Sequence, residues 1–391
     1  MSSRVALLLP GEASLGVMGG GQLGRMFVHA AQNLGYRTVV LDPDPQSPAG
    51  LVAHQHLRAD YLDEAALDQL AAACDAITTE FENVPAAALE RLARARFVAP
   101  AGGAVAICQD RAAEKAHFAA SAVAFAPYAL IITAADLQQV ADSLLPGILK
   151  TARMGYDGKG QARVKTRAEL ADAWGQAGEV PCVLEQMLPL VLELSVISAR
   201  SAAGDIVQFP VQQNLHRDGI LAVTQVPAPS ANSALQAQAL AAAAQIAASM
   251  DYVGVLCVEF FVLQDGTLIV NEMAPRPHNS GHYTLDACDV SQFDLQVRAM
   301  TGLPLRQPRL HSPTVMLNLL GDLWFDGSGE ERTPAWDRVL ALPGTHLHLY
   351  GKASARPGRK MGHLNITAAT ADGAKGLALQ AAAILGLPVD W

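Results

Sequence analysis

Aromatic residues, charged residues and long apolar stretches are all scarce in this 391-residue chain. Aromatic residues make up 5% of the sequence and charged residues 17%, and 37 acidic residues outnumber 28 lysines and arginines. The net charge of −9 argues against nucleic acid or an anionic membrane as a partner. The apolar stretch at residues 5–9 is too short for a signal peptide, and no segment is long enough to span a membrane. We therefore expect a soluble, cytoplasmic protein that binds small molecules.

The cysteines give no sign of a disulfide framework. Their number is odd and none stands in a Cys-x-x-Cys pair; they are Cys74, Cys108, Cys182, Cys257 and Cys288. Reduced, buried thiols in an intracellular protein fit this pattern best, and no local motif supports a catalytic cysteine.

Length and periodicity predict an α/β protein of two or three domains, because 41.1 kDa is too much for one simple core. Between residues 16 and 108, apolar runs of strand length alternate with helical segments, which predicts a parallel sheet with helices on its faces. Residues 128–150 are expected to form strand, helix and strand, and a small strand-rich end begins near residue 313. The other predicted strands are 15–18, 37–41, 76–79, 96–98, 181–186 and 193–199, and the predicted helices are 24–34, 65–73, 85–95, 110–120, 233–249, 289–300 and 374–385.

Residues 19–24, GGGQLG, match the GxGxxG pattern between a predicted strand and a predicted helix, and Asp42 ends the next strand. This arrangement is typical of dinucleotide-binding proteins. Alone, however, the glycines indicate only that backbone comes close to another group at a helix N-terminus.

The segment from Val258 to His282 carries the strongest chemical signal. Two apolar strand-like runs flank Asp265-Gly266, which predicts a hairpin with a two-residue turn. In that register residue 264 pairs with 267, and Glu259 stands opposite Glu272. Two facing carboxylates among apolar residues repel each other unless a cation lies between them, and Mg²⁺ is held by such oxygen ligands. We predict a metal–nucleotide site here; the alternative is an exposed hairpin with two solvated glutamates.

A glycine-rich loop follows the predicted strand that ends at Lys150. Three glycines, at 155, 158 and 160, surround Lys159. The N–H groups and the ammonium of such a loop can close on phosphates, although the loop is not a Walker A motif. An ordinary surface turn is the alternative.

The irregular loop at residues 274–282 directly follows Glu272. It contains Arg276, which suits bidentate recognition of a carboxylate, bicarbonate or phosphate. It also contains His278, which can bind a ligand or relay a proton near neutral pH. His282 is expected either to bind a ligand in the same way or to pack or form hydrogen bonds within the loop.

Residues 352–360, KASARPGRK, contain four basic residues and no acid. In an acidic protein this contrast indicates a site for a phosphorylated substrate, and a solvated hairpin tip is the alternative. His346 and His348 alternate on the preceding strand. Without an evident third ligand, packing is favoured over metal binding.

Taken together, these segments resemble an ATP-grasp enzyme over nearly the whole chain, and more narrowly the N5-carboxyaminoimidazole ribonucleotide synthetases. The motifs that carry the resemblance are GGGQLGRM (19–26), TEFENVP (79–85), QDRAAEK (109–115), GYDGKGQ (155–161), EQ (185–186), ELSVI (193–197), NLHRDGI (214–220), YVGVLCVEFF (252–261), NEMAPRPHNSGH (271–282) and RPGRKMGHLN (356–365).

The resemblance implies an ATP-grasp fold, α/β (α+β), in three domains. These are a Rossmann-like domain at 1–108, a lid-bearing domain at 109–190 and a C-terminal metal and substrate domain at 191–391, whose small end begins near 313. It also implies a reaction in purine biosynthesis. ATP phosphorylates bicarbonate to carboxyphosphate, which carboxylates 5-aminoimidazole ribonucleotide and leaves ADP and phosphate. The resemblance further implies that the enzyme uses Mg²⁺ or Mn²⁺, forms a homodimer and does not use biotin.

The resemblance assigns roles to individual residues, with Glu259 and Glu272 as metal ligands. The residues implied for ATP are Arg111, Lys150, Gly155, Tyr156, Asp157, Gly158, Lys159, Gly160, Gln161, Glu185, Gln186, Glu193, His216, Asn271 and Glu272. The residues implied for the ribonucleotide, bicarbonate and the new carbamate are Gln22, Glu80, Tyr156, Asp157, Arg276, His278, Lys352, Arg359 and Lys360, of which Tyr156, Asp157, Arg276, His278 and Lys352 are the catalytic candidates.

The sequence departs from the ATP-grasp pattern two positions after the second metal glutamate. Many members carry Asn there, whereas this chain has Ala274, so a third protein ligand is not expected. Three other functions compete with the first. They are another ATP-grasp ligase such as a formate-dependent glycinamide ribonucleotide transformylase, an NAD-dependent oxidoreductase, and a noncatalytic nucleotide-binding regulator.

Overall fold

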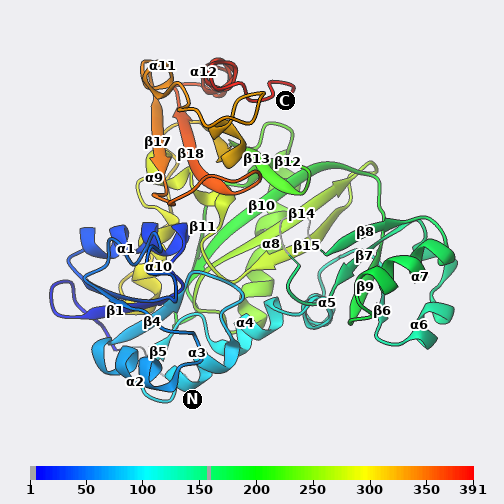
Figure 1. Ribbon diagram of the computed structural model, residues 1–391, viewed down its shortest axis with the longest axis horizontal. Helices are drawn as coiled ribbons and strands as arrows, with labels where there is room; N and C mark the ends of the chain where they lie inside the picture. Colours follow the sequence, from blue (N-terminus) through cyan, green and yellow to red (C-terminus); the bar gives the residue numbers. More distant parts are fainter. Residues whose placement is uncertain (1–5, 156–159) are drawn as a thin grey trace.

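Three β-sheets organise the computed structural model, which describes residues 6–155 and 160–391 (Figure 1). One sheet is N-terminal, one forms a separate lobe in the middle of the chain, and the largest connects the centre of the molecule to its C-terminal end. In the part of the chain that the structure describes, no helix has both the length and the apolar character to cross a membrane.

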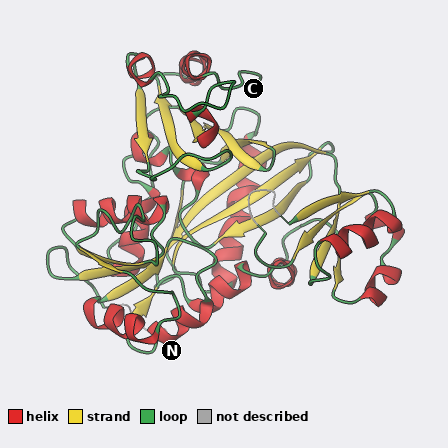
Figure 2. Cartoon of the chain, in the orientation of Figure 1, coloured by secondary structure: helices red, strands yellow, loops and turns green. Residues whose placement is uncertain are grey.

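The N-terminal sheet has five parallel strands in the order β3-β2-β1-β4-β5. Figure 2 shows helices on both of its faces, which explains why the strands are almost continuously apolar. The predicted parallel sheet is confirmed, although the short β3 was not foreseen. Its elements are β1 (Ser14–Met18), α1 (Gln22–Asn33), β2 (Arg37–Leu41), β3 (Gln55–Leu57), α2 (Glu64–Ala73), β4 (Ala76–Thr79), α3 (Ala86–Leu92) and β5 (Phe97–Val98), followed by α4 (Gly102–Cys108) and α5 (Arg111–Ala120).

The separate lobe is a four-stranded antiparallel sheet in the order β6-β9-β7-β8, packed against α6 and α7. Leu149, Leu170 and Trp174 are among the residues of its own small core. The glycine-rich segment connects β7 to β8. The elements are β6 (Tyr128–Ile131), α6 (Ala134–Gln139), η1 (Asp142–Leu144), β7 (Gly147–Thr151), β8 (Gln161–Val164), α7 (Arg167–Gln176) and β9 (Cys182–Gln186).

The largest sheet runs in the order β15-β14-β10-β12-β13-β16-β18-β17, with β11 paired to β10. The strand-rich C-terminal segment continues this sheet, because β13 pairs with β16. The strands are β10 (Leu190–Arg200), β11 (Ile206–Gln208), β12 (Gln212–Arg217), β13 (Ile220–Val226), β14 (Gly254–Leu263), β15 (Leu268–Ala274), β16 (Thr314–Leu320), β17 (Thr345–Leu349) and β18 (Lys360–Thr367). The helices are α8 (Ser233–Ser249), η2 (Asn279–Gly281), α9 (Thr284–Ala287), α10 (Gln292–Thr301), η3 (Gly321–Trp324), α11 (Trp336–Leu340) and α12 (Ala371–Leu385).

The β14–β15 hairpin pairs Glu259 with Glu272 as predicted, but the strand register near the turn differs from the predicted one. The predicted two-residue turn is wrong: Leu263 N–H donates to the Thr267 carbonyl, and Val262 pairs with Leu268 rather than with residue 269. Farther from the turn, a β-bulge shifts the register by one residue: Asn271 is the extra residue between Val270, which pairs with Phe260, and Glu272, which pairs with Glu259. A bulge of this kind re-aims side chains. Asn271 and its neighbour Glu272 both line the same cavity.

Helix α10 joins the N-terminal sheet to the largest sheet. Its Phe293, Val297 and Met300 pack in one core with Phe27 of α1. The buried Gln296 side chain receives a hydrogen bond from Val255 N–H and donates to the carbonyl of Ala99 (2.6 and 3.1 Å). One polar side chain therefore links the two sheets.

Candidate active site

A cavity of about 560 Å³ lies where the lobe, the β14–β15 hairpin and the loop after β15 come together. Most of the sequence-predicted residues that the structure describes line it, from segments far apart in the chain. These are Arg111, Lys150, Gly155, Gln161, Glu185, Gln186, Glu193, His216, Glu259, Asn271, Glu272, Arg276, His278 and Lys360.

The remaining predicted residues are not among those that line the cavity. Gly160 begins the described chain after the gap, Gln22 is the first residue of α1, and Glu80 directly follows β4. Lys352 and Arg359 lie in the segment between β17 and β18. The predictions made for Tyr156, Asp157, Gly158 and Lys159 fall outside the described residues.

The paired glutamates of the hairpin differ in their surroundings. Burial raises the pKa of Glu272, but the charge of Arg111, whose Nη1 lies 3.2 Å from Glu272 Oε2, together with the charge of Lys150 holds it below its usual value. No arginine is among the main influences on Glu259 from the described residues. Burial raises its pKa, the charge of His216 opposes this, and the carboxylates of Glu272 and Glu193 raise it further. Without a cation, the pair therefore favours one ionised and one protonated carboxyl group.

Two lysines hold a buried carboxylate on the lobe side of the cavity. Glu185 of β9 lies 2.7 Å from Lys150 Nζ of β7 and 3.0 Å from Lys115 Nζ of α5. Burial alone would raise the pKa of Glu185, but the two ammonium groups lower it to about 2. Three buried charges with a net charge of +1 suit an additional anionic group nearby.

Lys115 and its neighbour Glu114 were not predicted as site residues, although they belong to the 109–115 motif. Both form hydrogen bonds with the backbone of the edge strand β15: Lys115 Nζ donates to the Asn271 carbonyl, and Met273 N–H donates to Glu114 Oε1 (3.1 and 2.8 Å). Burial raises the pKa of Glu114 to about 7. Their place next to Arg111 in the sequence is a weak signal, because the edge strand that they cover lies more than 150 residues away.

Glu193 and His216 form a hydrogen-bonded ion pair between β10 and β12. Burial opposes the charged imidazole, but the hydrogen bond to Glu193 and the charge of Glu259 raise the pKa of His216 to about 9. His216 therefore carries a positive charge at neutral pH, on the wall next to Glu259.

Arg276 is anchored by Glu82, another residue that the sequence did not single out. The two side chains form an ion pair across 194 positions of sequence, and the Glu82 carboxylate keeps the guanidinium in place. The Arg276 charge also holds down the pKa of Glu82, although burial opposes this.

His278 is the N-cap of η2, where its Nδ1 lies 2.9 Å from Ser280 Oγ and its Nε2 lies 3.4 Å from Glu259 Oε1. Burial, followed by the Arg276 charge, holds the pKa of His278 well below its usual range. The imidazole is therefore neutral at physiological pH, and it faces Glu259, one of the two predicted metal ligands.

The glycine-rich turn before α1 does not offer its N–H groups to a dinucleotide. Gly21 N–H and Gly24 N–H donate to the two carboxylate oxygens of Glu80 (2.9 and 3.1 Å), and Gly20 N–H donates to Asp42 Oδ2 (2.6 Å). The helix N-terminus, where a pyrophosphate would bind, already has an anion from the chain itself. The geometry therefore argues against the dinucleotide interpretation.

The basic segment between β17 and β18 is held by its own backbone. Lys352 Nζ donates to the Lys360 carbonyl (2.7 Å), and Arg359 Nη1 donates to the Ser354 carbonyl (2.7 Å). His346 and His348 of β17 both lie near Asp286, with His348 Nε2 2.7 Å from Asp286 Oδ2. These two histidines therefore pair with an acid of α9, in agreement with the predicted packing role.

Comparison with known proteins covers almost the whole chain. Three family models match: "Ribonucleotide synthetase preATP-grasp domain" at residues 13–109, "ATP-grasp domain" at 116–293 and "Phosphoribosylaminoimidazole carboxylase C-terminal domain" at 314–376. The N5-carboxyaminoimidazole ribonucleotide synthase of Brucella melitensis is 44% identical over 360 residues, which are 91% of this chain and 96% of the relative. That of Bacillus subtilis is 41% identical over 92% of both chains.

Solved structures agree. The N5-carboxyaminoimidazole synthetase of Staphylococcus aureus complexed with ADP superposes with a TM-score of 0.89 at 36% identity, over 97% of this chain and 99% of that one. The Aspergillus clavatus enzyme in complex with ADP and 5-aminoimidazole ribonucleotide has a TM-score of 0.87 at 31% identity, over 96% and 99%. The fold and the cavity thus define an ATP-grasp ligase. Within that class, the chain belongs to the N5-carboxyaminoimidazole ribonucleotide synthase family, which confirms the resemblance seen in the sequence.

Proposed function

We propose that the protein uses ATP and bicarbonate to carboxylate 5-aminoimidazole ribonucleotide to N5-carboxyaminoimidazole ribonucleotide. Family membership makes the chain an ATP-dependent ligase with this ribonucleotide as its substrate. One observation carries the assignment to this chain's own residues. A single cavity brings together the glutamate pair, the ion pair of Glu185 and Lys150 with Lys115 behind it, and the Arg276–His278 loop.

The ATP phosphates are proposed to bind between Arg111, Lys150 and the glycine-rich segment. Phosphoryl transfer depends on positioning and charge neutralisation more than on covalent chemistry, so cations at fixed positions are what it requires. Glu185 and Gln186 on β9, with Glu193 and His216, are proposed to line the adenosine side. Gly155, Gly160, Gln161 and the undescribed Tyr156, Asp157, Gly158 and Lys159 belong to the proposed lid, which would exclude water from a labile intermediate.

Mg²⁺ or Mn²⁺ is proposed at Glu259 and Glu272, with Asn271 next to them. The donor set fits a hard divalent cation, since both ligands are carboxylates directly opposite each other on paired strands. A cation would also relieve the repulsion that raises the pKa of Glu259. When bound, the ion would neutralise phosphate charge during transfer. Ala274 supplies no third ligand.

Arg276 and His278 are proposed to handle the carboxyl group. The guanidinium suits a planar oxyanion such as bicarbonate or the new carbamate, and Glu82 fixes its orientation. In the second step the exocyclic amine attacks the carboxyl carbon of carboxyphosphate, phosphate leaves and the amine loses a proton. Because burial keeps the imidazole of His278 neutral, its ring nitrogen can accept a hydrogen bond from the amine, and the departing phosphate can take up the proton that the amine loses.

The ribonucleotide is proposed to lie between the glycine-rich turn and the basic segment. Gln22 and Glu80, with Tyr156 and Asp157, are assigned to its imidazole and ribose, and Lys352, Arg359 and Lys360 to its phosphate. The division into domains at 1–108, 109–190 and 191–391, the homodimer, the cytoplasmic location and the absence of biotin from the reaction belong to the same proposal.

The test is ADP release with ATP, Mg²⁺ and bicarbonate, measured with and without 5-aminoimidazole ribonucleotide. We expect strong stimulation by the ribonucleotide and no activity with formate and glycinamide ribonucleotide. ADP release that is indifferent to the ribonucleotide would leave the ATP-grasp core in place and overturn the substrate, together with the roles of Lys352 and Arg359.

A further inference from the structure

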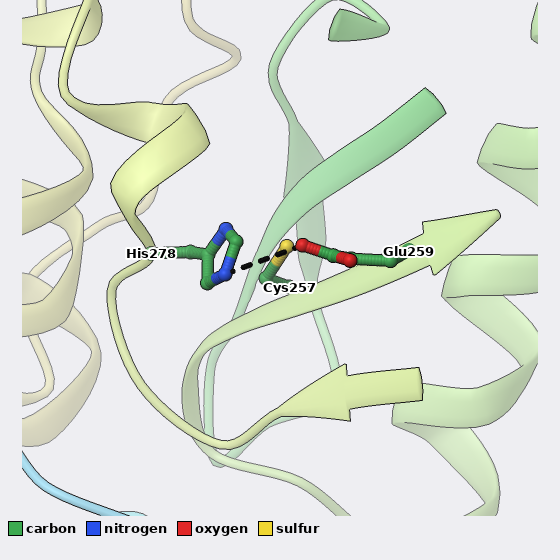
Figure 3. Close-up of side chains that lie close together, drawn as sticks. All are labelled: Cys257, Glu259 and His278. Carbon is green, nitrogen blue, oxygen red and sulfur yellow. Dashed lines mark ion pairs between the residues drawn. The ribbon is translucent and has the colours of Figure 1, made fainter. Parts of the chain in front are cut away.

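Three side chains with metal-ligand atoms meet behind the proposed Mg²⁺ position: Cys257, Glu259 and His278 (Figure 3). Cys257 and Glu259 are two residues apart on β14, so they project from the same face of the sheet. His278 approaches from the loop after β15, with its free ring nitrogen toward Glu259. Glu259 and His278 line the cavity, whereas Cys257 is fully buried behind them.

The spacing of these atoms suits a single tetrahedral ion. Bonds of about 2.0–2.3 Å from a zinc ion to N, O and S ligands place neighbouring ligand atoms about 3.3–3.8 Å apart. His278 Nε2 and Glu259 Oε1 are 3.4 Å apart, and the three ligand atoms all lie within 4.8 Å of one another. Small rotations of the side chains would close the group around an ion.

We infer that Cys257, Glu259 and His278 form a site for a soft divalent cation such as Zn²⁺, and that an ion bound there inhibits the enzyme by taking Glu259 from the Mg²⁺ position. The binding site stands on its own geometry, while the inhibition rests on the proposed function. A thiolate, an imidazole and a carboxylate form a ligand set that zinc favours, and Mg²⁺ prefers oxygen ligands alone. Glu259 and His278 line the cavity, so a fourth ligand such as water could reach the ion from that side.

The residue opposite Cys257 in the strand pair is Ala274, whose small side chain also lines the cavity. Binding a cation must displace the thiol proton, as zinc does at other thiol ligands.

A titration with Co²⁺ as the only added metal tests the site. A thiolate ligand gives Co²⁺ a charge-transfer absorption, and tetrahedral geometry gives it intense visible bands. We expect both signals when Co²⁺ is titrated into metal-free protein, and their loss in Cys257→Ser. Cys74→Ser is the matched control, since Cys74 is also a buried thiol with a raised pKa but lies in the N-terminal core. Absence of the thiolate band from the unmodified protein, or its persistence in Cys257→Ser, would overturn the site. Cys257→Ala replaces the serine variant if that variant does not fold.

Inhibition is measured as Zn²⁺ titrations of ribonucleotide-stimulated ADP release at fixed Mg²⁺ and ATP, each relative to the same variant without Zn²⁺. Loss of the sulfur ligand should raise the half-inhibitory Zn²⁺ concentration by about ten-fold or more, while Cys74→Ser matches the unmodified protein. Equal sensitivity of Cys257→Ser would overturn the inhibitory role. If the enzyme shows no ribonucleotide-stimulated ADP release with Mg²⁺, ATP and bicarbonate in the absence of Zn²⁺, the proposed function is contradicted, and the cobalt spectrum still decides the site.

Discussion

At the scale of single residues, the site depends on charges whose partners are distant in sequence. The hairpin made Glu259 and Glu272 predictable, because their pairing follows from local register and apolar surroundings. Glu82 and Lys115 were not predictable in the same way. Their partners Arg276 and Glu185 come from other elements, and nothing in the local pattern indicates which strands become neighbours.

Glu272→Gln tests the proposed metal role at this scale. The amide keeps the shape of the side chain but removes the charge that a divalent cation requires, so we expect ADP release to fall by about a hundred-fold or more. The fold should survive, because Glu272 faces the cavity and its side chain is 42% exposed. Glu90→Gln, an exposed position, is the control. Undiminished turnover in a folded Glu272→Gln protein would contradict the assignment.

At the scale of elements, the sequence predicted best where one local signal dominates. The alanine-rich helix α8 begins and ends where it was predicted, at Ser233–Ser249, with the Asn232 side chain as its N-cap. Strand β12 was missed because its sequence, QQNLHR, is polar. The strand nevertheless lies in the protein interior, because Gln212 and Asn214 are buried and form hydrogen bonds with Ser195 (3.0 and 2.8 Å). Hydrophobic periodicity cannot identify a strand whose buried side chains are satisfied by one another.

The hairpin turn provides a matched pair of glycine substitutions. Gly266 has φ +84° and no atom within 4 Å of an added Cβ, so Gly266→Ala should lower the free energy of unfolding by about 1–2 kcal/mol through backbone strain alone. Gly103 also has open space but lies in α4, where Gly103→Ala should raise it by up to about 1 kcal/mol. Urea unfolding measures both. A Gly266→Ala protein as stable as the unmodified one would contradict the turn conformation.

At the scale of the whole molecule, α10 connects the N-terminal sheet to the sheet that carries the glutamates. Gln296→Leu keeps the volume of the side chain but leaves Val255 N–H and the Ala99 carbonyl without this partner inside the protein. We expect a loss of about 2–4 kcal/mol in the free energy of unfolding, because buried backbone groups would remain desolvated and unpaired. Gln176→Leu, at an exposed site, is the control. A difference between the two variants of less than about 1 kcal/mol would show that the link contributes little.

The response of the whole molecule to acid follows from two buried histidines. Burial holds the pKa values of His282 and His363 well below 6.5, so the unfolded chain binds protons at these imidazoles that the folded chain does not. These two groups by themselves should lower stability as the pH falls below about 6.5, by up to about 2.7 kcal/mol per pH unit. Glu114 and Glu259, whose pKa values burial raises to about 7, act in the opposite direction between about pH 7 and 4.5, because the folded chain binds their protons first. Below about pH 4.5, the stabilising effect of Glu185 should also diminish, because its folded pKa is about 2.

Denaturant unfolding at a series of pH values between 7 and 5 measures this slope. His363→Gln removes one of the two groups and should lower the slope by up to about 1.4 kcal/mol per pH unit relative to the unmodified protein, whereas His311→Asn, at an exposed position, should leave it unchanged. Equal slopes in His363→Gln and in the unmodified protein would contradict a buried neutral His363.

In the proposed ribonucleotide site, the carboxyl group of Glu80 at the start of α1 also bears on which way round the ligand would bind. Its two oxygens already accept from the N–H groups of Gly21 and Gly24, so this end of the proposed site does not offer those N–H groups to a phosphate and suits groups that donate hydrogen bonds. The basic segment begins nearby, since Gly351 lies against the guanidinium of Arg25 on α1. In the proposed site, a ribonucleotide with an amino group on its ring at one end and a phosphate at the other would therefore meet a hydrogen-bond acceptor at one end and cations at the other. That polarity would favour one orientation of the ligand over the reverse.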